Sequence, residues 1–233
     1  MTYLFTPAAQ ASVPVRDRAE SFPVRRIYCC AQNYAEHEKE MGSTPERAKP
    51  FGFLKPADAV LPVRAGEVGT MPFPPASQNL HHELELVVAL GSGGYNLTPE
   101  QADACIIGWG VGLDMTCRDL QAEAKAKGRP WDSAKAFDHA APISELVLRQ
   151  PGQGVPSSGA IALDVNGTAR QAGDLSDMIW TPAEIISWFS KIWEFKAGDL
   201  VFTGTPKGVA QVVSGDLLEG RVAGVGELRV RIG

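Results

Sequence analysis

The sequence has neither a strong excess of one charge nor a long apolar run. Its 22 basic and 27 acidic residues give a net charge of −5 at pH 7, so nucleic acid and anionic membranes are poor partners. The most apolar run, residues 104–113, is too short to cross a bilayer. The first 20 residues also lack the basic segment and apolar core of a secretory signal. These absences favour a cytoplasmic protein that binds neither nucleic acid nor membrane.

Cysteine is scarce, and two familiar site motifs are missing. The four cysteines include no CxxC pair, which favours reduced, buried thiols. The stretch "HHELEL" (81–86) has no second histidine four residues on, as a zinc-protease helix requires. The stretch "VFTGTPKGV" (201–209) lacks the residue order of a nucleotide-binding P-loop. The sequence therefore argues against a zinc protease and a P-loop enzyme.

What the sequence does contain is enough apolar residues for one large domain. It has 233 residues, of which 44% are hydrophobic. Residues 1–23 carry three prolines and are expected to form an irregular arm before a single domain at 24–233. In that domain, short aliphatic runs alternate with turn residues, as strands do. The predicted strands are 26–30, 51–54, 84–90, 106–114, 161–166, 200–203 and 228–232.

Three stretches have the composition of helices, at 33–41, 117–127 and 182–195. The second is rich in good helix formers and ends at Gly128. The third begins with Thr181 as N-cap and Pro182 at the first helical position. Its apolar residues recur at helical spacing and should face a core; they are Ile185, Ile186, Phe189 and Ile192. The predicted fold class is mixed α+β, rich in strands, with a few packed helices.

Two glutamates stand at the start of the predicted strand 84–90. Because side chains alternate along a strand, Glu83 and Glu85 point to one face, where they repel each other unless a cation lies between them. A hard cation such as Mg²⁺ or Mn²⁺ prefers carboxylate oxygens and would need a third acidic ligand. Asp114, at the end of strand 106–114, stands where a strand gives way to a helix. Two solvated glutamates at a strand end fit the local pattern equally well.

His37 and Glu40 lie three residues apart in the predicted helix 33–41. On a helix they share a face and can form a hydrogen bond. A carboxylate that orients an imidazole is the arrangement that a general base needs to take a proton from water. An ordinary solvated helix has the same spacing, and on spacing alone that alternative is favoured.

Polar and basic residues on the helix 117–127, at position 135 and in one turn are candidates for contact with an anionic ligand. Arg118 and Gln121 lie near one stripe of the helix 117–127, together with Lys125, and the Arg118 guanidinium suits a carboxylate. Lys135 either extends to the surface or is placed to meet an anion. The Gly–Thr–Pro turn at 204–206 would present backbone N–H groups and the Thr205 hydroxyl, although alone it is only a tight turn.

Taken in order, these segments resemble the fumarylacetoacetate hydrolase superfamily. Within it, the chain is most similar to acylpyruvate hydrolases, in particular bacterial fumarylpyruvate hydrolases. The resemblance implies a β-sandwich roll, a homodimer, and one Mg²⁺ or Mn²⁺ ion in each site. The matching segments are "NYAEHEKEMG", "FLKPADAV", "NLHHELELVVALG", "GWGVGLDMTCRDLQAEAKAKGRPWDSAKAFDHAAPIS", "VNGTARQAGDLSDMIW" and "GDLVFTGTPKGV".

The resemblance also implies roles for individual residues. The metal ligands would be Glu83, Glu85 and Asp114. His37 and Glu40 would form a catalytic dyad on a helix that orders over the substrate. The residues that hold substrate oxygens would be Arg118, Gln121, Lys135 and Thr205. Two positions depart from the pattern: Ala31-Gln32 replaces a common Gly-Arg, which could alter substrate preference, and Ala210 replaces a glycine.

The reaction implied is hydrolysis of the C–C bond of a 3-acylpyruvate, with 3-fumarylpyruvate of gentisate-type aromatic degradation as the preferred substrate. His37 would activate water, and the metal and Lys135 would stabilise the departing pyruvate enolate. Relatives in the superfamily instead decarboxylate oxaloacetate, or isomerise or decarboxylate dienoic acids. A non-catalytic keto-acid-binding protein is the alternative from another class. The pairing of His37 with Glu40 argues against it, because a binding protein needs no base.

Overall fold

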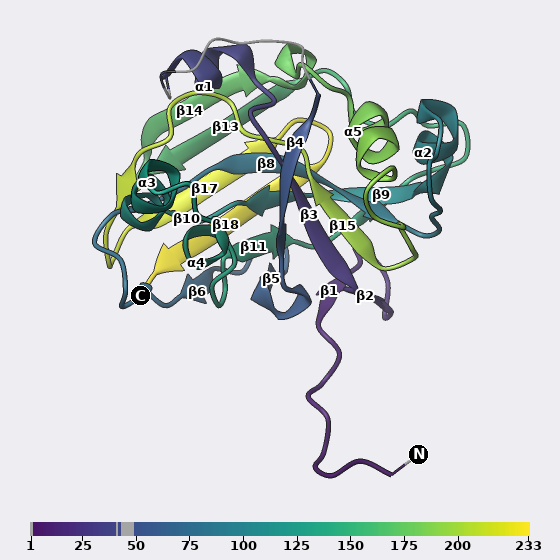
Figure 1. Ribbon diagram of the computed structural model, residues 1–233, viewed down its shortest axis with the longest axis horizontal. Helices are drawn as coiled ribbons and strands as arrows, with labels where there is room; N and C mark the ends of the chain where they lie inside the picture. Colours follow the sequence, from purple (N-terminus) through teal and green to yellow (C-terminus); the bar gives the residue numbers. More distant parts are fainter. Residues whose placement is uncertain (1, 41, 43–48) are drawn as a thin grey trace.

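Two β-sheets packed against each other form most of the fold (Figure 1). The structure is a computed structural model and describes residues 2–40, 42 and 49–233. The larger sheet has eight strands, ordered β4 (Phe51–Lys55), β3 (Arg26–Ala31), β15 (Asp199–Phe202), β8 (Leu84–Leu90), β9 (Ile106–Leu113), β11 (Ala141–Ser144) and β5 (Val60–Val63), with β12 (Val147–Leu148) also paired to β9. The smaller has five, ordered β14 (Thr168–Asp174), β13 (Ala160–Val165), β17 (Leu217–Val222), β18 (Gly226–Ile232) and β6 (Gly69–Met71).

Short ladders and helices complete the fold. One ladder joins β10 (Thr116–Cys117), β7 (Leu80–His81) and β16 (Gln211–Val212). The helices are α1 (Ala35–Glu40), α2 (Pro99–Cys105), α3 (Arg118–Ala126), α4 (Asp132–Lys135) and α5 (Pro182–Phe189), with 3-10 turns at Ala57–Ala59 and Leu175–Asp177. The predicted β-rich fold with a few packed helices is confirmed. Residue 41, the last of the predicted helix 33–41, lies outside the described residues.

Strands β8 and β9 lie at the centre of the larger sheet, and every residue of β8 is buried. Because side chains alternate along a strand, β8 supplies two cores. The core shared with the smaller sheet takes Leu84, Leu86, Val88 and Leu90, and the core on the opposite face takes Val87 and Ala89. A Cβ at Gly112 of β9 would lie 2.5 Å from Val87 Cγ2, so glycine is required beside this valine. The two strands therefore pack closely beside the point where β8 begins and β9 ends.

The N-terminal residues differ from the irregular arm that the prolines predict. That expectation is wrong for residues 12–23, because β1 (Ser12–Pro14) and β2 (Ser21–Pro23) form an antiparallel pair. Val13 and Phe22 of this pair are buried in the core on the outer face of the larger sheet. Burial of these apolar side chains outweighs the proline content. The residues before β1 extend away from the sheets (Figure 1).

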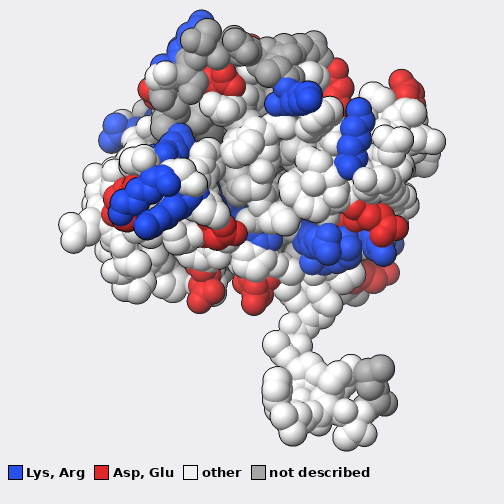
Figure 2. Space-filling model, in the orientation of Figure 1, with Lys and Arg blue, Asp and Glu red and all other residues white. Residues whose placement is uncertain are grey.

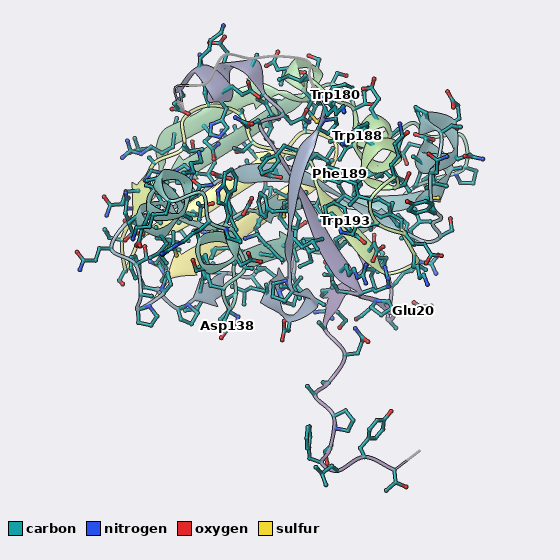
Figure 3. The ribbon with its side chains drawn as sticks, viewed as in Figure 1. Glu20, Asp138, Trp180, Trp188, Phe189 and Trp193 are labelled. Carbon is teal, nitrogen blue, oxygen red and sulfur yellow. The ribbon has the colours of Figure 1, made fainter. Side chains whose placement is uncertain are left out.

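Helix α5 begins as predicted and ends earlier than predicted. Thr181 accepts a hydrogen bond from the Glu184 N–H, and Pro182 follows at the first helical position. The helix ends at Phe189, whereas 195 was predicted. The expectation that Ile192 faces a core is wrong, because its residue surface is 57% exposed. Beyond the helix Trp193 packs instead on Phe189, with ring centroids 5.6 Å apart (Figure 3).

All four cysteines are buried and free of disulfides, in agreement with the prediction of reduced thiols. Within the part of the chain that the structure describes, no helix has the length and apolar character needed to span a membrane.

Candidate metal and active site

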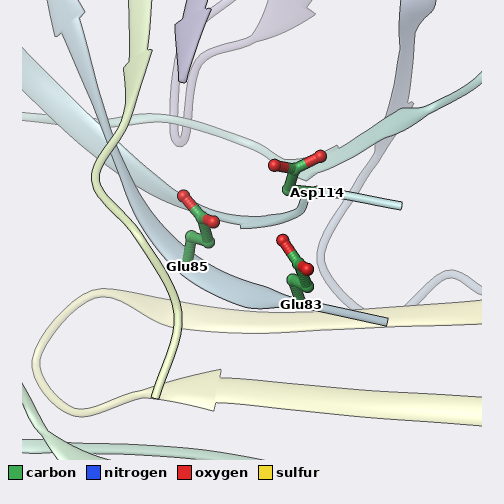
Figure 4. A group of neighbouring side chains, drawn as sticks. All are labelled: Glu83, Glu85 and Asp114. Atoms are coloured by element: carbon green, nitrogen blue, oxygen red, sulfur yellow. The ribbon is translucent and has the colours of Figure 1, made fainter. Parts of the chain in front are cut away.

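Three carboxylates meet where β8 begins and β9 ends. The strands are antiparallel, with Leu84 opposite Leu113, so Glu83 and Glu85 come next to Asp114. One oxygen of each carboxylate lies within 4.8 Å of an oxygen of the other two, and the three side chains point toward a common space (Figure 4). The exposed fractions are 5%, 2% and 2%. The alternative of two solvated glutamates is therefore wrong.

Three cations neutralise two of these carboxylates. The Lys135 Nζ lies 2.7 Å from Glu83 Oε2 and 2.8 Å from Asp114 Oδ2. The Arg118 guanidinium lies 2.6 Å from Glu83 Oε1, and the Lys55 Nζ lies 2.9 Å from Asp114 Oδ1. Burial alone would raise the pKa of Glu83, but the charges of Lys135 and Arg118 hold that pKa below its usual range. Burial would likewise lower the pKa of Lys135, but Asp114 and Glu83 raise it above its usual range.

Glu85 differs from the other two because no cation of the described residues pairs with it. Its Oε2 accepts a hydrogen bond of 2.7 Å from the Gly204 N–H. Burial and the charge of Asp114 raise the pKa of Glu85 well above its usual range. Each carboxylate oxygen keeps a lone pair beyond its present contact, and oxygen-only donors suit hard divalent cations. The donor set therefore fits Mg²⁺ or Mn²⁺, which would relieve the unbalanced charge at Glu85.

Lys55 belongs to this cluster, although the sequence assigned it no role. It ends β4, and its side chain is 0% exposed. Besides Asp114, its ammonium donates to the carbonyls of Met115 (3.3 Å) and Lys135. A lysine that ends an apolar strand and precedes a proline, as in "FGFLKP", was the available signal. The burial of Lys135, at 3% exposed, also shows that its side chain does not extend to the surface.

His37 faces the same cavity as the carboxylates from helix α1, and Glu40 lies beside it on the same helix. The His37 Nδ1 lies 3.3 Å from Glu40 Oε2. His37 is buried and lines the cavity, which contradicts the alternative of an ordinary solvated helix. Glu40 also accepts a hydrogen bond of 3.1 Å from the Gly208 N–H, on the loop after β15. The carboxylate thus holds the imidazole in place from one side, as a general base requires.

Asn33 anchors the residues that lead into α1. Its side-chain amide donates to the carbonyls of Thr203 (2.7 Å) and Trp180 (2.9 Å), and its carbonyl oxygen accepts from the Trp180 N–H (2.7 Å). Gly204, with a φ of +98°, packs so closely that a Cβ there would lie 2.6 Å from the Asn33 Cβ. The start of α1 is therefore tied to the same turn that donates to Glu85.

Arg118 and Gln121 lie side by side on α3, as the helical stripe predicts. The Arg118 Nη1 donates to Gln121 Oε1 at 2.7 Å. The Arg118 Nε is buried and has no hydrogen-bond partner in residues 2–40, 42 and 49–233. A buried donor without a partner is costly. Arg118 as a residue lines the cavity, so its guanidinium is the cation of α3 nearest to the carboxylate cluster.

Thr205 lines the cavity, but its hydroxyl contacts the protein. It donates to the Leu84 carbonyl at 2.8 Å and accepts from the Gln171 amide at 2.8 Å. Gln171, buried on β14, also accepts from the Leu84 N–H at 3.0 Å. Gln171 therefore joins the start of β8 to the turn at Thr205, a role that sequence reasoning missed because a lone glutamine in a polar strand carries no signal. Thr205 as a substrate ligand stays a prediction.

The two adjacent histidines lie beside the carboxylate cluster and outside it. His81 contacts the Asn79 amide oxygen at 2.9 Å, and burial and the charge of Arg118 lower the pKa of His81 to about 4. His82 is fully buried and contacts the Gln171 amide oxygen at 2.9 Å. Both histidines thus serve to support the strand that leads into Glu83.

The two departures from the expected pattern lie in loops. Gln32 lines the cavity next to α1 and adopts a φ of +58°, a conformation that glycine takes more readily. Ala210 lies just before β16, outside the residues that line the cavity. Only Gln32 is placed to affect a ligand.

The chain belongs to the fumarylacetoacetate hydrolase family, because the family model described as "Fumarylacetoacetate (FAA) hydrolase C-terminal" matches residues 26–233. It is 45% identical to the fumarylpyruvate hydrolase of Ralstonia sp over 165 residues, which cover 70% of this chain and 84% of the relative. It is 41% identical to the oxaloacetate tautomerase YcgM of Escherichia coli over 198 residues, 84% of this chain and 88% of the relative.

A solved structure agrees with this assignment. The crystal structure of fumarylpyruvate hydrolase from Pseudomonas aeruginosa, in complex with Mn²⁺ and pyruvate, has a TM-score of 0.96 and 47% sequence identity, and the match covers 99% of each chain. The predicted family is confirmed. Tautomerisation, the activity in the name of the Escherichia coli relative, was not among the predicted alternatives.

Proposed function

We propose that this protein hydrolyses the C–C bond of a 3-acylpyruvate, with 3-fumarylpyruvate as the preferred substrate and fumarate and pyruvate as products. The observation that carries the proposal is the buried His37, oriented by Glu40 over the same cavity as the carboxylate cluster. Hydrolysis needs a base that activates water beside a site that stabilises the departing enolate. The similarity to two fumarylpyruvate hydrolases supports this choice of substrate.

We infer that Mg²⁺ or Mn²⁺ is held by Glu83, Glu85 and Asp114. When bound, the ion acts as a Lewis acid toward the oxygens of the 2-oxo acid. The Mn²⁺ in the Pseudomonas aeruginosa structure supports this inference. Lys55, Lys135 and Arg118 equal the three carboxylates in number, although none of them pairs with Glu85. A bound dication therefore leaves an excess of positive charge on the floor of the cavity, which is formed by Glu83, Glu85 and Asp114 with these three cations. That excess favours an anionic substrate.

The protein's own side chains have separate roles in substrate binding, proton transfer and stabilisation of the enolate. The guanidinium of Arg118, with Gln121 beside it in the cavity lining, holds the carboxylate of the pyruvyl end. His37 takes a proton from water, and the resulting hydroxide attacks the carbonyl of the acyl group. The C–C bond breaks, its electron pair passes to the pyruvyl part as an enolate, and Lys135 stabilises that charge. Protonation of the methylene carbon completes pyruvate.

Oxaloacetate tautomerase activity is a second candidate, favoured by the similarity to the Escherichia coli relative. Interconversion of keto and enol forms moves a proton between carbon and oxygen and needs no attack by water. The same His37 beside the same cluster could move that proton. The two activities therefore differ in whether water is consumed, and only the products distinguish them.

The experiment is a substrate panel with purified protein and Mg²⁺ or Mn²⁺. We expect fumarylpyruvate to give equal amounts of fumarate and pyruvate, and acetylpyruvate to react more slowly. Loss of the enol absorbance of oxaloacetate without release of CO₂ would instead identify a tautomerase, and CO₂ with pyruvate a decarboxylase. Absence of turnover with every compound would contradict catalysis and favour a keto-acid-binding protein.

Three broader expectations remain part of the proposal. They are a homodimer, a cytoplasmic location, and a place in gentisate-type aromatic degradation. Light scattering on the eluted protein measures the first directly, and a monomer at working concentration would contradict it.

A further inference from the structure

Lys125 is a cation at the rim of the active-site cavity that has no anionic partner. It lies on α3 and lines the cavity. No carboxylate of the described residues lies within ion-pair distance of its ammonium. The other basic residues near the end of α3 are paired, because Glu123 lies 2.6 Å from Lys127 and 3.8 Å from Arg129. Lys125 therefore differs from the basic side chains that gather over α3 (Figure 2).

An aromatic side chain holds the Lys125 ammonium at this position. The Nζ lies 5.0 Å from the centre of the Trp131 ring, within cation–π distance. Trp131 in turn packs on Phe51 and Phe53, with ring centroids 5.2 and 6.2 Å away. Partial burial and the charge of Arg118 lower the pKa of Lys125, because both disfavour its charged form; a neighbouring anion would offset this effect. The rim thus offers a positive charge next to an aromatic surface.

Two positions along α3, at Arg118 and at Lys125, can each bind a negatively charged group of a ligand. Arg118, Gln121 and Lys125 follow one face of the helix, with Arg118 in contact with Glu83 at the floor. Seven residues separate Arg118 from Lys125, which corresponds to roughly 10 Å along the helix axis. Phe53 and Trp131 also line the cavity. An elongated ligand can therefore place one carboxylate at Arg118, a flat apolar segment along the aromatic rings, and a second anion at Lys125.

We propose that Lys125 binds a carboxylate at the far end of the acyl group, so that the site selects 3-acylpyruvates whose planar, unsaturated acyl chain ends in a second carboxylate. This inference rests on the proposed hydrolase function and specifies the substrate class of the same site. Lys125 acts on specificity and takes no part in breaking the bond.

The experiment compares kcat/KM for fumarylpyruvate with kcat/KM for acetylpyruvate, which has no second carboxylate. Lys125→Gln is expected to lower this ratio about 10-fold, the lower end of the effect of a hydrogen bond to a charged group, because the rim is partly solvated. The loss should fall mainly on KM. Lys125→Arg keeps the positive charge and should retain most of the preference. Lys127→Gln, on the same helix but paired with Glu123, is the matched control and should keep the wild-type ratio.

The outcomes separate this inference from the function on which it rests. A wild-type protein that hydrolyses both compounds equally well, or a Lys125→Gln variant with an unchanged ratio, overturns the role of Lys125 and leaves the hydrolase proposal standing. Equal losses on both compounds also overturn it, because the residue would then act on the shared pyruvyl end or on the fold. Failure of the wild type to hydrolyse either compound overturns the proposed function and the inference together.

Discussion

The floor of the active-site cavity and helix α1 differ in the interactions that hold them in place. On the floor, Asp114 and Lys55 are both almost wholly buried. Asp114 directly follows the central strand β9, and Lys55 ends β4 at the edge of the larger sheet. Helix α1 has six residues, and its Glu36 and Lys39 side chains are 58% and 60% exposed. The floor is a network of buried ion pairs, whereas α1 is held by a few hydrogen bonds at Asn33 and Glu40.

This difference indicates how stability and activity are distributed. A network of buried charges must be complete before any ligand binds, since each unpaired member is costly. A short helix with few buried contacts contributes little to global stability. We therefore expect changes on the floor to affect folding and metal binding, and changes on α1 to affect turnover. Four substitutions test this comparison.

The largest effect is expected at Glu85. Glu85→Gln removes a predicted metal ligand, so Mn²⁺ binding and hydrolysis should be lost together. Because no described cation pairs with Glu85, the metal-free protein should remain folded and be as stable as the wild type. The amide oxygen can still accept from the Gly204 N–H. Calorimetry with Mn²⁺, product assays and urea unfolding without metal measure the three effects. Full activity of the wild type in a strong chelator would refute the metal assignment.

His37→Ala should lower kcat by ~10²–10⁴-fold, the usual consequence of losing a general base. Mn²⁺ affinity and the melting temperature should stay near those of the wild type, because His37 lies on α1 and its ion-pair partner is Glu40, outside the floor. Rate assays beside Mn²⁺ titration separate the two properties. Turnover like that of the wild type would remove the His37–Glu40 pair from the mechanism.

Lys55→Met should lower the free energy of unfolding by about 3–5 kcal/mol, because it leaves the buried Asp114 carboxylate with one cation fewer. The matched control is Lys39→Met on α1. That lysine is exposed and pairs with Glu36, so its loss should cost less than about 0.5 kcal/mol. Urea unfolding of both variants measures the difference. Equal losses in the free energy of unfolding for Lys55→Met and Lys39→Met would contradict the difference between the floor and helix α1.

The smallest effect is expected at Glu40. Glu40→Gln retains an acceptor for the Gly208 N–H but removes the charge that orients His37. Loss of such an orienting partner typically costs about 10-fold in activity, and here it should appear in kcat. Glu36→Gln on the same helix is the control and should change kcat little. A larger loss at Glu36 than at Glu40 would show that the helix acts through its surface charge.

Much of the central sheet could be predicted because its signals are local. The bounds of β8 match the prediction residue for residue, since an unbroken aliphatic run is typical of a strand buried on both faces. The cap at Thr181 was predicted from the same kind of short-range pattern. Helix α2 was missed although "TPEQ" has the residues of a capping box, with the Thr98 side chain accepting from the Gln101 N–H.

Other elements carry no local signal. Strand β14 is mostly polar, and of its residues only Gln171 is buried, so it forms through pairing with β13. The end of α5 was predicted too late because helical spacing continues past Phe189. The Ser190 hydroxyl accepts from the Leu97 N–H at 2.8 Å, a contact between distant segments that holds the chain where the helix ends.

For the site, the sequence by itself determined which chemistry is available. Alternation along β8 put Glu83 and Glu85 on one face, and helical spacing put His37 beside Glu40, because both rules act within a few residues. Only the tertiary structure decided that Lys55 neutralises Asp114, that Gln171 supports Thr205, and that Lys125 stands unpaired at the rim. The contacts of Lys55 and Gln171 join segments far apart in the chain, and the burial that gives them their strength exists only once the sheets have packed.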